Sequence, residues 1–180
     1  MNEQEIIASC KRADHKSQEM LYMRFSDVMF RTALRYVRNN DDAEDIIIIA
    51  FSKVFKSIKS FNYSGKGCLE AWIRKIVVNE SLMFLRKRYN FSLTESLDIS
   101  IPEPDLTELG RLEAEDILEM INQLPTGYRT VFNLYVIEGY DHQEISMMLN
   151  ISEGTSRSQL FKAKAILKKV LIKEGYNYGT

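Results

Sequence analysis

The chain has 180 residues, of which 45% are hydrophobic and 27% charged, and its formal net charge is -1. This length and composition allow one medium domain or two domains of about 80 residues, each with its own core, and exclude a disordered tail. The two cysteines, Cys10 and Cys68, form no C-x-x-C pair, so neither a disulfide framework nor a metal site is expected. The acidic N-terminus is unlike a signal peptide, and no apolar run approaches the roughly 18 residues of a membrane span. We therefore expect a cytoplasmic protein with no membrane segment.

Charge is unevenly distributed along the chain. Residues 1–89 contain 16 Lys and Arg against 11 Asp and Glu, whereas residues 90–110 contain five acids and no base. Residues 111–151 are again acidic, with two bases against seven acids. Residues 152–173 are basic, with six bases against one acid. Two basic segments separated by acidic ones indicate a protein that contacts a polyanion at two places.

The first half of the chain has helical periodicity, which predicts at least three helices. Apolar side chains recur every three or four residues from Leu21 to Tyr36 and again from Ala43 to Ile58. Capping and acidic residues at Asn39–Asp42 favour the start of the second helix. A third helix is expected from Leu69 to Arg88, after a loop with two glycines at Phe61–Gly67.

From residue 90 to residue 110 the periodicity fails, Pro102 and Pro104 appear, and every charged side chain is acidic. Such a stretch is typical of a flexible linker. The periodicity then returns, and it predicts helices over residues 112–124, 128–138, 141–149 and 152–173. The expected fold is therefore all-α, with two small helical domains, residues 1–89 and 111–180, joined by a flexible acidic linker.

The last two expected helices have the pattern of a helix-turn-helix. Asp141 and Glu144 have the spacing of a capping box at the start of the first helix, and Asn150 tolerates the left-handed backbone of a tight turn. The second helix keeps its basic side chains outward, so its start can enter a major groove while longer side chains reach phosphates. The alternative is an ordinary helical hairpin with a solvated basic face.

Several motifs follow one another along the chain. The first half contains Asp42-Ala43-Glu44-Asp45-Ile46 and Trp72-Ile73-x-x-Ile76-x-x-Asn79. The second half contains Leu124-Pro125-x-x-Tyr128-Arg129, Glu138-Gly139-Tyr140-Asp141-x-x-Glu144-Ile145 and Ile151-Ser152-Glu153-Gly154-Thr155-x-Arg157-Ser158. In this order and at this spacing, the motifs resemble those of bacterial RNA polymerase sigma factors of the extracytoplasmic-function class, in the sigma-70 family.

The resemblance implies a function in transcription initiation. Proteins of this family bind core RNA polymerase and direct it to promoters; their first domain melts and reads the minus-ten element, and their second reads the minus-thirty-five element. The implied partners are core RNA polymerase and promoter DNA, both as duplex and as melted strand, with no cofactor and no catalytic residue. Whether an anti-sigma protein also binds is left open. The alternative is a stand-alone helix-turn-helix regulator that binds duplex DNA without polymerase, but it gives no reason for an aromatic, lysine-bearing loop in the first domain.

The minus-ten surface must capture bases that leave the stack, and aromatic rings beside cations can do this. The candidate residues of this surface are Phe61, Tyr63, Lys66, Lys75 and Asn79. Trp72 is expected in the core instead, because it lies on the apolar stripe of its helix. Asn79 would be costly to bury unpaired, so we expect it to contact either a base or a backbone group.

The minus-thirty-five surface is expected at the start of the last helix. The candidate residues are Thr155, Ser156, Arg157, Gln159, Lys162 and Lys164. Arg157 can make a bidentate contact to a base, whereas Lys162 and Lys164 are suited to phosphates. The family often has arginine where these two lysines stand, and lysine lacks the planar fork that reads bases.

The clearest departure from the family pattern is the pair Ile48 and Ile49, where a Gln followed by an acid is usual on the helix that docks against polymerase. The six residues after Asp45 are all apolar and span more than one helical turn, so the core cannot receive them all. We expect Asp45, Ile48 and Ile49 to form an exposed polymerase-docking surface; a thicker core is the alternative. The acidic linker is either a solvated tether or, within the polymerase, a mimic of nucleic acid.

Overall fold

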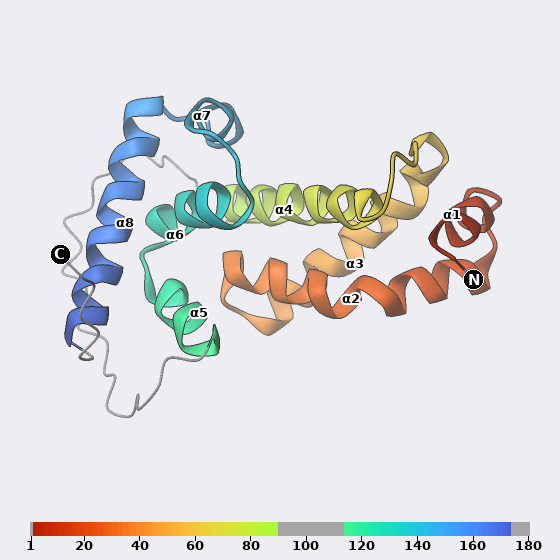
Figure 1. Cartoon of the computed structure of the whole chain (residues 1–180), viewed down its shortest axis with the longest axis horizontal. Coiled ribbons are helices and arrows are strands. Elements are labelled where there is room, and N and C mark those ends of the chain that lie inside the picture. Colours follow the sequence, from red (N-terminus) through yellow and green to blue (C-terminus); the bar gives the residue numbers. More distant parts are fainter. Residues whose placement is uncertain (1, 90–113, 174–180) are drawn as a thin grey trace. The chain divides into compact units, whose positions relative to one another are not determined.

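The computed structural model describes residues 2–89 and 114–173. The chain divides into two compact units, Met1–Asn90 and Phe91–Thr180. Within the described ranges all regular structure is helical, so the expectation of an all-α fold is confirmed (Figure 1). The expected acidic linker, residues 90–110, lies outside the described residues.

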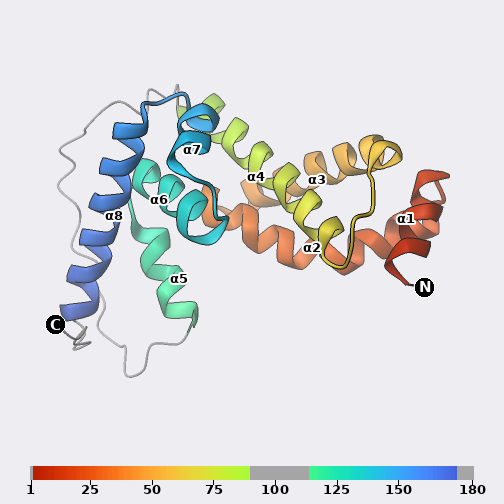
Figure 2. The same cartoon turned by 45° about the horizontal axis from the view of Figure 1, so that its top comes forward.

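Between residues 2 and 89, the first unit contains four α-helices and a short 3-10 turn. They are α1 (Glu3–Lys11), α2 (His15–Val37), α3 (Asn40–Ser57), η1 (Ile58–Ser60) and α4 (Cys68–Tyr89). Helices α2, α3 and α4 pack against one another, and α1 packs against α2 and η1 (Figure 2). The side chains of Leu21, Met29, Tyr36, Ile46 and Ile73 are fully buried between the three long helices. The three predicted helices are confirmed, and α1 is an additional one.

Capping side chains fix where these helices start. The Asn39 side chain accepts a hydrogen bond from the backbone N–H of Asp42 at 2.9 Å, as the sequence predicts for the start of α3. Asp14 caps α2 in the same way through the N–H of Ser17 at 2.8 Å. Local polar contacts thus define the starts of α2 and α3.

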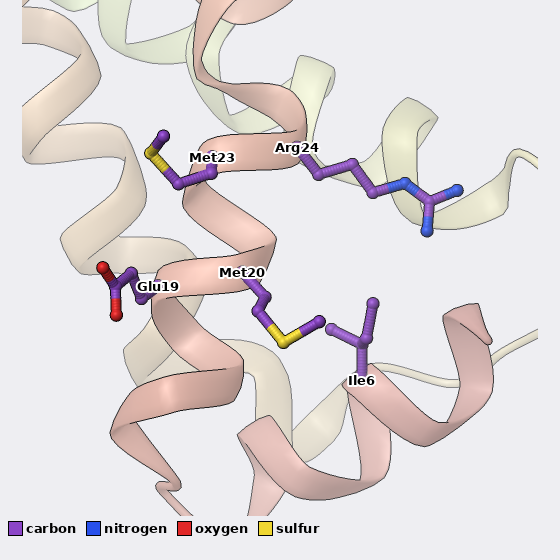
Figure 3. A pocket seen from close by; sticks show the side chains of 5 residues that line it. All are labelled: Ile6, Glu19, Met20, Met23 and Arg24. Atoms are coloured by element: carbon purple, nitrogen blue, oxygen red, sulfur yellow. The ribbon is translucent and has the colours of Figure 1, made fainter. Parts of the chain in front are cut away.

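A shallow pocket lies between α1 and α2. It is lined by Ile6, Glu19, Met20, Met23 and Arg24. Met20 points toward Ile6, whereas Glu19 and Met23 point to the other side of α2 (Figure 3). Because Ile6 is 5% exposed, the contact between these two helices is apolar at its centre.

Across residues 114–173, the second unit contains four α-helices and one π-helical turn. They are α5 (Ala114–Gln123), α6 (Thr126–Phe132), η2 (Asn133–Ile137), α7 (His142–Leu149) and α8 (Glu153–Lys173). Helix α8 packs against α6 and α7. The helix expected over residues 128–138 therefore starts earlier, after Pro125, and ends as the π-helical turn η2.

Arg129 ties the end of α5 to α6. Its side chain is buried, and its Nη1 donates to the backbone carbonyl of Leu124 at 2.7 Å. The last carbonyls of a helix have no partner within the helix, so the Arg129 side chain supplies one for the Leu124 carbonyl.

Two kinds of feature are absent from residues 2–89 and 114–173. None of the helices there is both long and apolar enough to cross a membrane. Nor does this part of the chain place three or more His, Cys, Asp or Glu side chains where they could hold a metal ion.

Candidate nucleic-acid and polymerase interfaces

Helices α7 and α8 form the expected helix-turn-helix. Asp141 Oδ1 accepts from the N–H of Glu144 at 2.7 Å, and the N–H of Asp141 donates to Glu144 Oε2 at 2.9 Å, which completes the capping box. Asn150 ends α7 with φ 54° and ψ 48°, the left-handed conformation that this residue type tolerates. The N–H of Thr155 then donates to Ser152 Oγ at 3.0 Å in the first turn of α8.

A part-buried contact joins α7 to the start of α8, the expected recognition helix. Ser156 is fully buried, and its Oγ lies 2.8 Å from Nδ1 of His142. The His142 ring stacks on Tyr135, with ring centroids 4.6 Å apart. Burial, and then the positive charge of Arg157, lower the pKa of His142, which favours the neutral ring.

Two of the six candidate minus-thirty-five residues are therefore structural. Ser156 faces His142 inside the unit, and Gln159 is 8% exposed, so the expectation that these two side chains contact DNA is wrong. Both lie on the inner face of α8, which packs on α6 and α7. Thr155 is half-buried, and its hydroxyl lies 2.9 Å from that of Ser152.

The other three candidates are on the surface of α8. Arg157 is exposed and forms an ion pair with Glu153 at 2.8 Å. Lys162 and Lys164 are exposed too, and each ammonium lies over a tyrosine ring, 5.9 Å from the Tyr128 centroid and 5.8 Å from the Tyr135 centroid. An exposed cationic face of this kind can contact a duplex, with Arg157 on bases and the lysines on phosphates.

Phe161 is a candidate that the sequence argument missed. It is 74% exposed, one turn beyond Arg157 on the outer face of α8. Apolar side chains on such a face can contact the methyl group of thymine. The helical spacing in the sequence indicates this exposure. Phe161 lies four residues after Arg157 and off the stripe of Leu160 and Ala163, which are buried.

In the first unit, the loop between η1 and α4 presents only part of the expected surface. Tyr63 and Lys66 are exposed, but Phe61 is 7% exposed and its ring lies 4.8 Å from that of Trp72. The expectation that Phe61 stacks on a melted base is therefore wrong, since its ring is already covered within the protein. Gly65 has φ 142°, a conformation that a side chain would strain, and it lets the loop turn back to α4.

The first turns of α4 continue this surface. Lys75 and Asn79 are both exposed and, being four residues apart, lie on one face of the helix. Met83, which is 53% exposed, and Lys87 extend the same stripe. The Asn79 amide is therefore free of any burial penalty and accessible to a base.

The outer face of α3 carries the two unusual isoleucines. Ile48 is 64% and Ile49 is 48% exposed, and Asp45 is exposed beside them. Ile47 and Ala50 are buried, which is the facing expected from the helical period. The alternative of a thicker core is therefore wrong.

Two family models match the chain, in the order of the two units. The model for Sigma-70 region 2 matches residues 21–90, and the model for Sigma-70, region 4 matches residues 114–167. Full-length relatives align across both segments. The chain belongs to the sigma-70 family. Within this family its relatives place it in the extracytoplasmic-function (ECF) class.

The similar proteins are themselves sigma factors. The chain is 24% identical to the ECF RNA polymerase sigma-E factor of Haemophilus influenzae, over 93% of this chain and 94% of that protein. It is 24% identical to the RNA polymerase sigma-H factor of Pseudomonas aeruginosa, over 94% and 93%. In fold it resembles the sigma factor RpoE of Bartonella quintana, crystallised with the anti-sigma factor NepR, with a TM-score of 0.51 and 21% identity, over 85% of this chain and 95% of that one.

The family matches leave two helical segments of the described chain uncovered. The region 2 match begins at Leu21, within α2, so α1 and the first six residues of α2 precede it. Region 4 ends at Leu167, within α8, after all the exposed basic candidates of the recognition helix up to Lys164. The helix-turn-helix is thus wholly contained in region 4, whereas the contact of α1 with η1 is not described by the family model.

Proposed function

We propose how this sigma factor divides promoter recognition between its two units. As a member of the sigma-70 family, it binds core RNA polymerase and directs it to promoters. A stand-alone helix-turn-helix regulator is not favoured, because the region 2 match accounts for the first unit from Leu21 onward. The chain acts by binding in the cytoplasm and not by catalysis.

The second unit reads the minus-thirty-five element. The observation that supports this most directly is the capped helix-turn-helix whose second helix exposes Arg157 near its start. Arg157 makes a bidentate contact to a guanine, and the nearby Glu153 carboxylate holds its guanidinium in place until DNA arrives. Lys162 and Lys164 contact phosphates, and the tyrosine rings beneath them restrict their flexible stems.

The first unit melts and reads the minus-ten element. Tyr63 supplies an exposed ring on which a base can stack, at about 1 to 3 kcal/mol per base. Lys66 and Lys75 attract the backbone of the displaced strand, and Asn79 hydrogen bonds to a base edge. These four exposed residues, without Phe61, make up the proposed melted-strand surface.

The outer face of α3 docks on core RNA polymerase. Burying one isoleucine at an interface contributes roughly 1.5 to 3 kcal/mol, so Ile48 and Ile49 can replace the polar contacts that the family uses. Asp45 lies beside them and gives the surface a charged edge. The same apolar face is the one for which an anti-sigma protein would compete, and a similar fold has been crystallised with such a partner.

Reconstitution with core RNA polymerase tests this function. The purified chain should form a complex with core polymerase and allow initiation at a promoter that core polymerase alone ignores. A stand-alone regulator would bind duplex DNA tightly without polymerase and add no initiation. That second result would overturn the proposal.

A further inference from the structure

We propose that Lys11 of α1 is a positioning residue for the loop Phe61–Gly67, which it holds in the shape that presents Tyr63 and Lys66 to the melted strand. The inference rests on the proposed role of this loop in the minus-ten surface. It adds a task for α1, a helix that lies before the region 2 match.

Helix α1 is built as a rigid support. Its first turn is closed by a capping box, in which Asn2 Oδ1 accepts from the N–H of Glu5 and Glu5 Oε2 accepts from the N–H of Asn2, both at 2.8 Å. Ile7 and Cys10 are almost fully buried against the rest of the unit. Nine residues would form a marginal helix alone, so α1 owes its order to this packing.

Lys11 links α1 to the loop through a hydrogen bond. Its Nζ donates to the backbone carbonyl of Phe61 at 2.7 Å, in a partly buried contact between residues 50 apart in sequence. A hydrogen bond from an ammonium is shorter and stronger than a neutral one, and partial burial shields it from water. In both views the connection from α3 to α4 lies beside α1 (Figure 1, Figure 2).

Phe61 is thereby fixed from three sides. Its N–H donates to the carbonyl of Ile58 in η1 at 3.1 Å, its carbonyl accepts from Lys11, and its ring packs on Trp72 of α4. The buried ring of Phe61 does not stack on a base, but it anchors the loop whose Tyr63 is proposed to do so. Lys11 is the member of this set that comes from outside region 2.

Beyond Phe61 the loop is held only lightly. The N–H of Ser64 donates to Cys68 Sγ at 3.4 Å, and the N–H of Cys68 donates to the Gly65 carbonyl at 3.2 Å. Gly65 and Gly67 have positive φ, so their backbones are intrinsically permissive. The position of Tyr63, two residues after Phe61, thus depends on the anchor, and a loop ordered in advance loses less entropy when it binds a strand.

The test compares Lys11→Met with Lys11→Arg and with the control Lys16→Met, which removes an exposed lysine from α2. In holoenzyme on duplex promoter, Lys11→Met should slow open-complex formation about five- to tenfold, while closed-complex affinity and activity on a pre-melted template stay within about twofold. Lys11→Arg keeps a donor and should restore most of the rate. Wild-type opening rates for Lys11→Met, together with slow opening by Tyr63→Ala, would overturn the inference.

Hydrogen exchange distinguishes positioning from general destabilisation. In Lys11→Met, the amides of residues 62–67 should exchange faster, while those in the buried turns of α2 and α4 keep their protection. Unchanged loop exchange would overturn the inference, and so would faster exchange throughout the unit.

A parallel Tyr63→Ala variant separates this inference from the proposed function. If Tyr63→Ala opens promoters normally, the melting role of the loop is wrong, while loop exchange in Lys11→Met still decides whether Lys11 positions it. If Tyr63→Ala is slow, the double variant with Lys11→Met should be slowed by clearly less than the two single losses combined, because Lys11 acts through the loop that carries Tyr63. Additive losses would contradict that coupling.

Discussion

Arg157 and Lys164 lie about two turns apart on α8, and truncating them should affect DNA binding in different ways. Arg157→Ala should weaken binding to the specific upstream element by about 1 to 3 kcal/mol, because a bidentate base contact is lost. Lys164→Ala should weaken specific and scrambled elements alike and reduce the salt dependence by about one phosphate contact. Competition binding of holoenzyme to duplexes that differ only in this element measures both. Equal losses on both duplexes for both variants would contradict the assignment.

His142 should titrate below the ordinary histidine pKa of about 6.5. Burial lowers its pKa most, Arg157 and Lys164 lower it further, and Asp141 and Glu153 act in the opposite direction. Proton NMR can follow the ring directly, since the chain has only two histidines and the spectrum of His142→Gln assigns the resonance. A pKa at or above 6.5 would contradict the half-buried, neutral state of this ring.

The same lowered pKa gives the sign of a pH effect on stability. As the pH falls below about 6.5, the unfolded chain protonates His142 before the folded chain does, so unfolding takes up a proton and the free energy of unfolding decreases. The stabilisation is fully present above the pKa that His142 has in the unfolded chain. It is lost as the pH falls through the lower pKa that His142 has in the folded chain. His142→Gln should remove this part of the pH dependence in denaturant melts.

At the scale of elements, the loop Phe61–Gly67 and the exposed face of α4 that carries Asn79 should act in promoter opening. Tyr63→Ala and Asn79→Ala should slow opening of duplex promoter and leave a pre-melted template nearly unaffected, because stacking and amide contacts serve only unstacked bases. Phe61→Ala is the contrasting variant: it removes a buried ring and should cost about 3 to 5 kcal/mol of unfolding free energy. Circular dichroism measures that loss. Equal defects of Tyr63→Ala on both templates would indicate that Tyr63 is structural.

Local patterns in the sequence predicted much of this structure. The capping box of Asp141 and Glu144, the left-handed Asn150 and the outward facing of Ile48 and Ile49 are all as expected. Each follows from residues within one or two helical turns, where spacing determines which groups can meet.

The residues that sequence reasoning misplaced have partners far along the chain. Phe61 was expected on the surface because it adjoins a glycine loop, but Trp72, eleven residues on, covers its ring. Ser156 was expected among the DNA contacts, but His142, fourteen residues earlier, is its partner. Helix α1 is too short for its period to stand out, and its order comes from packing. Only the fold brings these groups together.

At the scale of the whole molecule, Ile48 and Ile49 should matter to the holoenzyme and not to the free chain. Replacing them with Gln and Glu should change the free energy of unfolding by no more than about 0.5 kcal/mol, as expected of exposed sites. Affinity for the chain's own core polymerase should fall at least about tenfold, or 1.4 kcal/mol, as apolar contacts are lost. Thermal melts and a core-binding titration measure the two quantities.

Ile47→Ala is the matched control for this pair. Ile47 is buried on the opposite face of α3, so its truncation should cost about 2 to 5 kcal/mol of stability. A loss of that size from the Ile48 and Ile49 substitutions would place the two side chains in the core. Unchanged stability with unchanged polymerase affinity would leave this face to another partner, such as an inhibitory protein.

The two cysteines differ enough in exposure for selective chemical labelling. Cys10 is 2% exposed, and burial raises the pKa of its thiol, with Asp14 adding to the effect, so little reactive thiolate forms there. Cys68 is only partly buried and stands at the first residue of α4, directly after the loop that carries Tyr63 and Lys66. A thiol-reactive fluorophore therefore reaches Cys68 first, and the unmodified sequence already provides an attachment point from which DNA opening can be followed in real time.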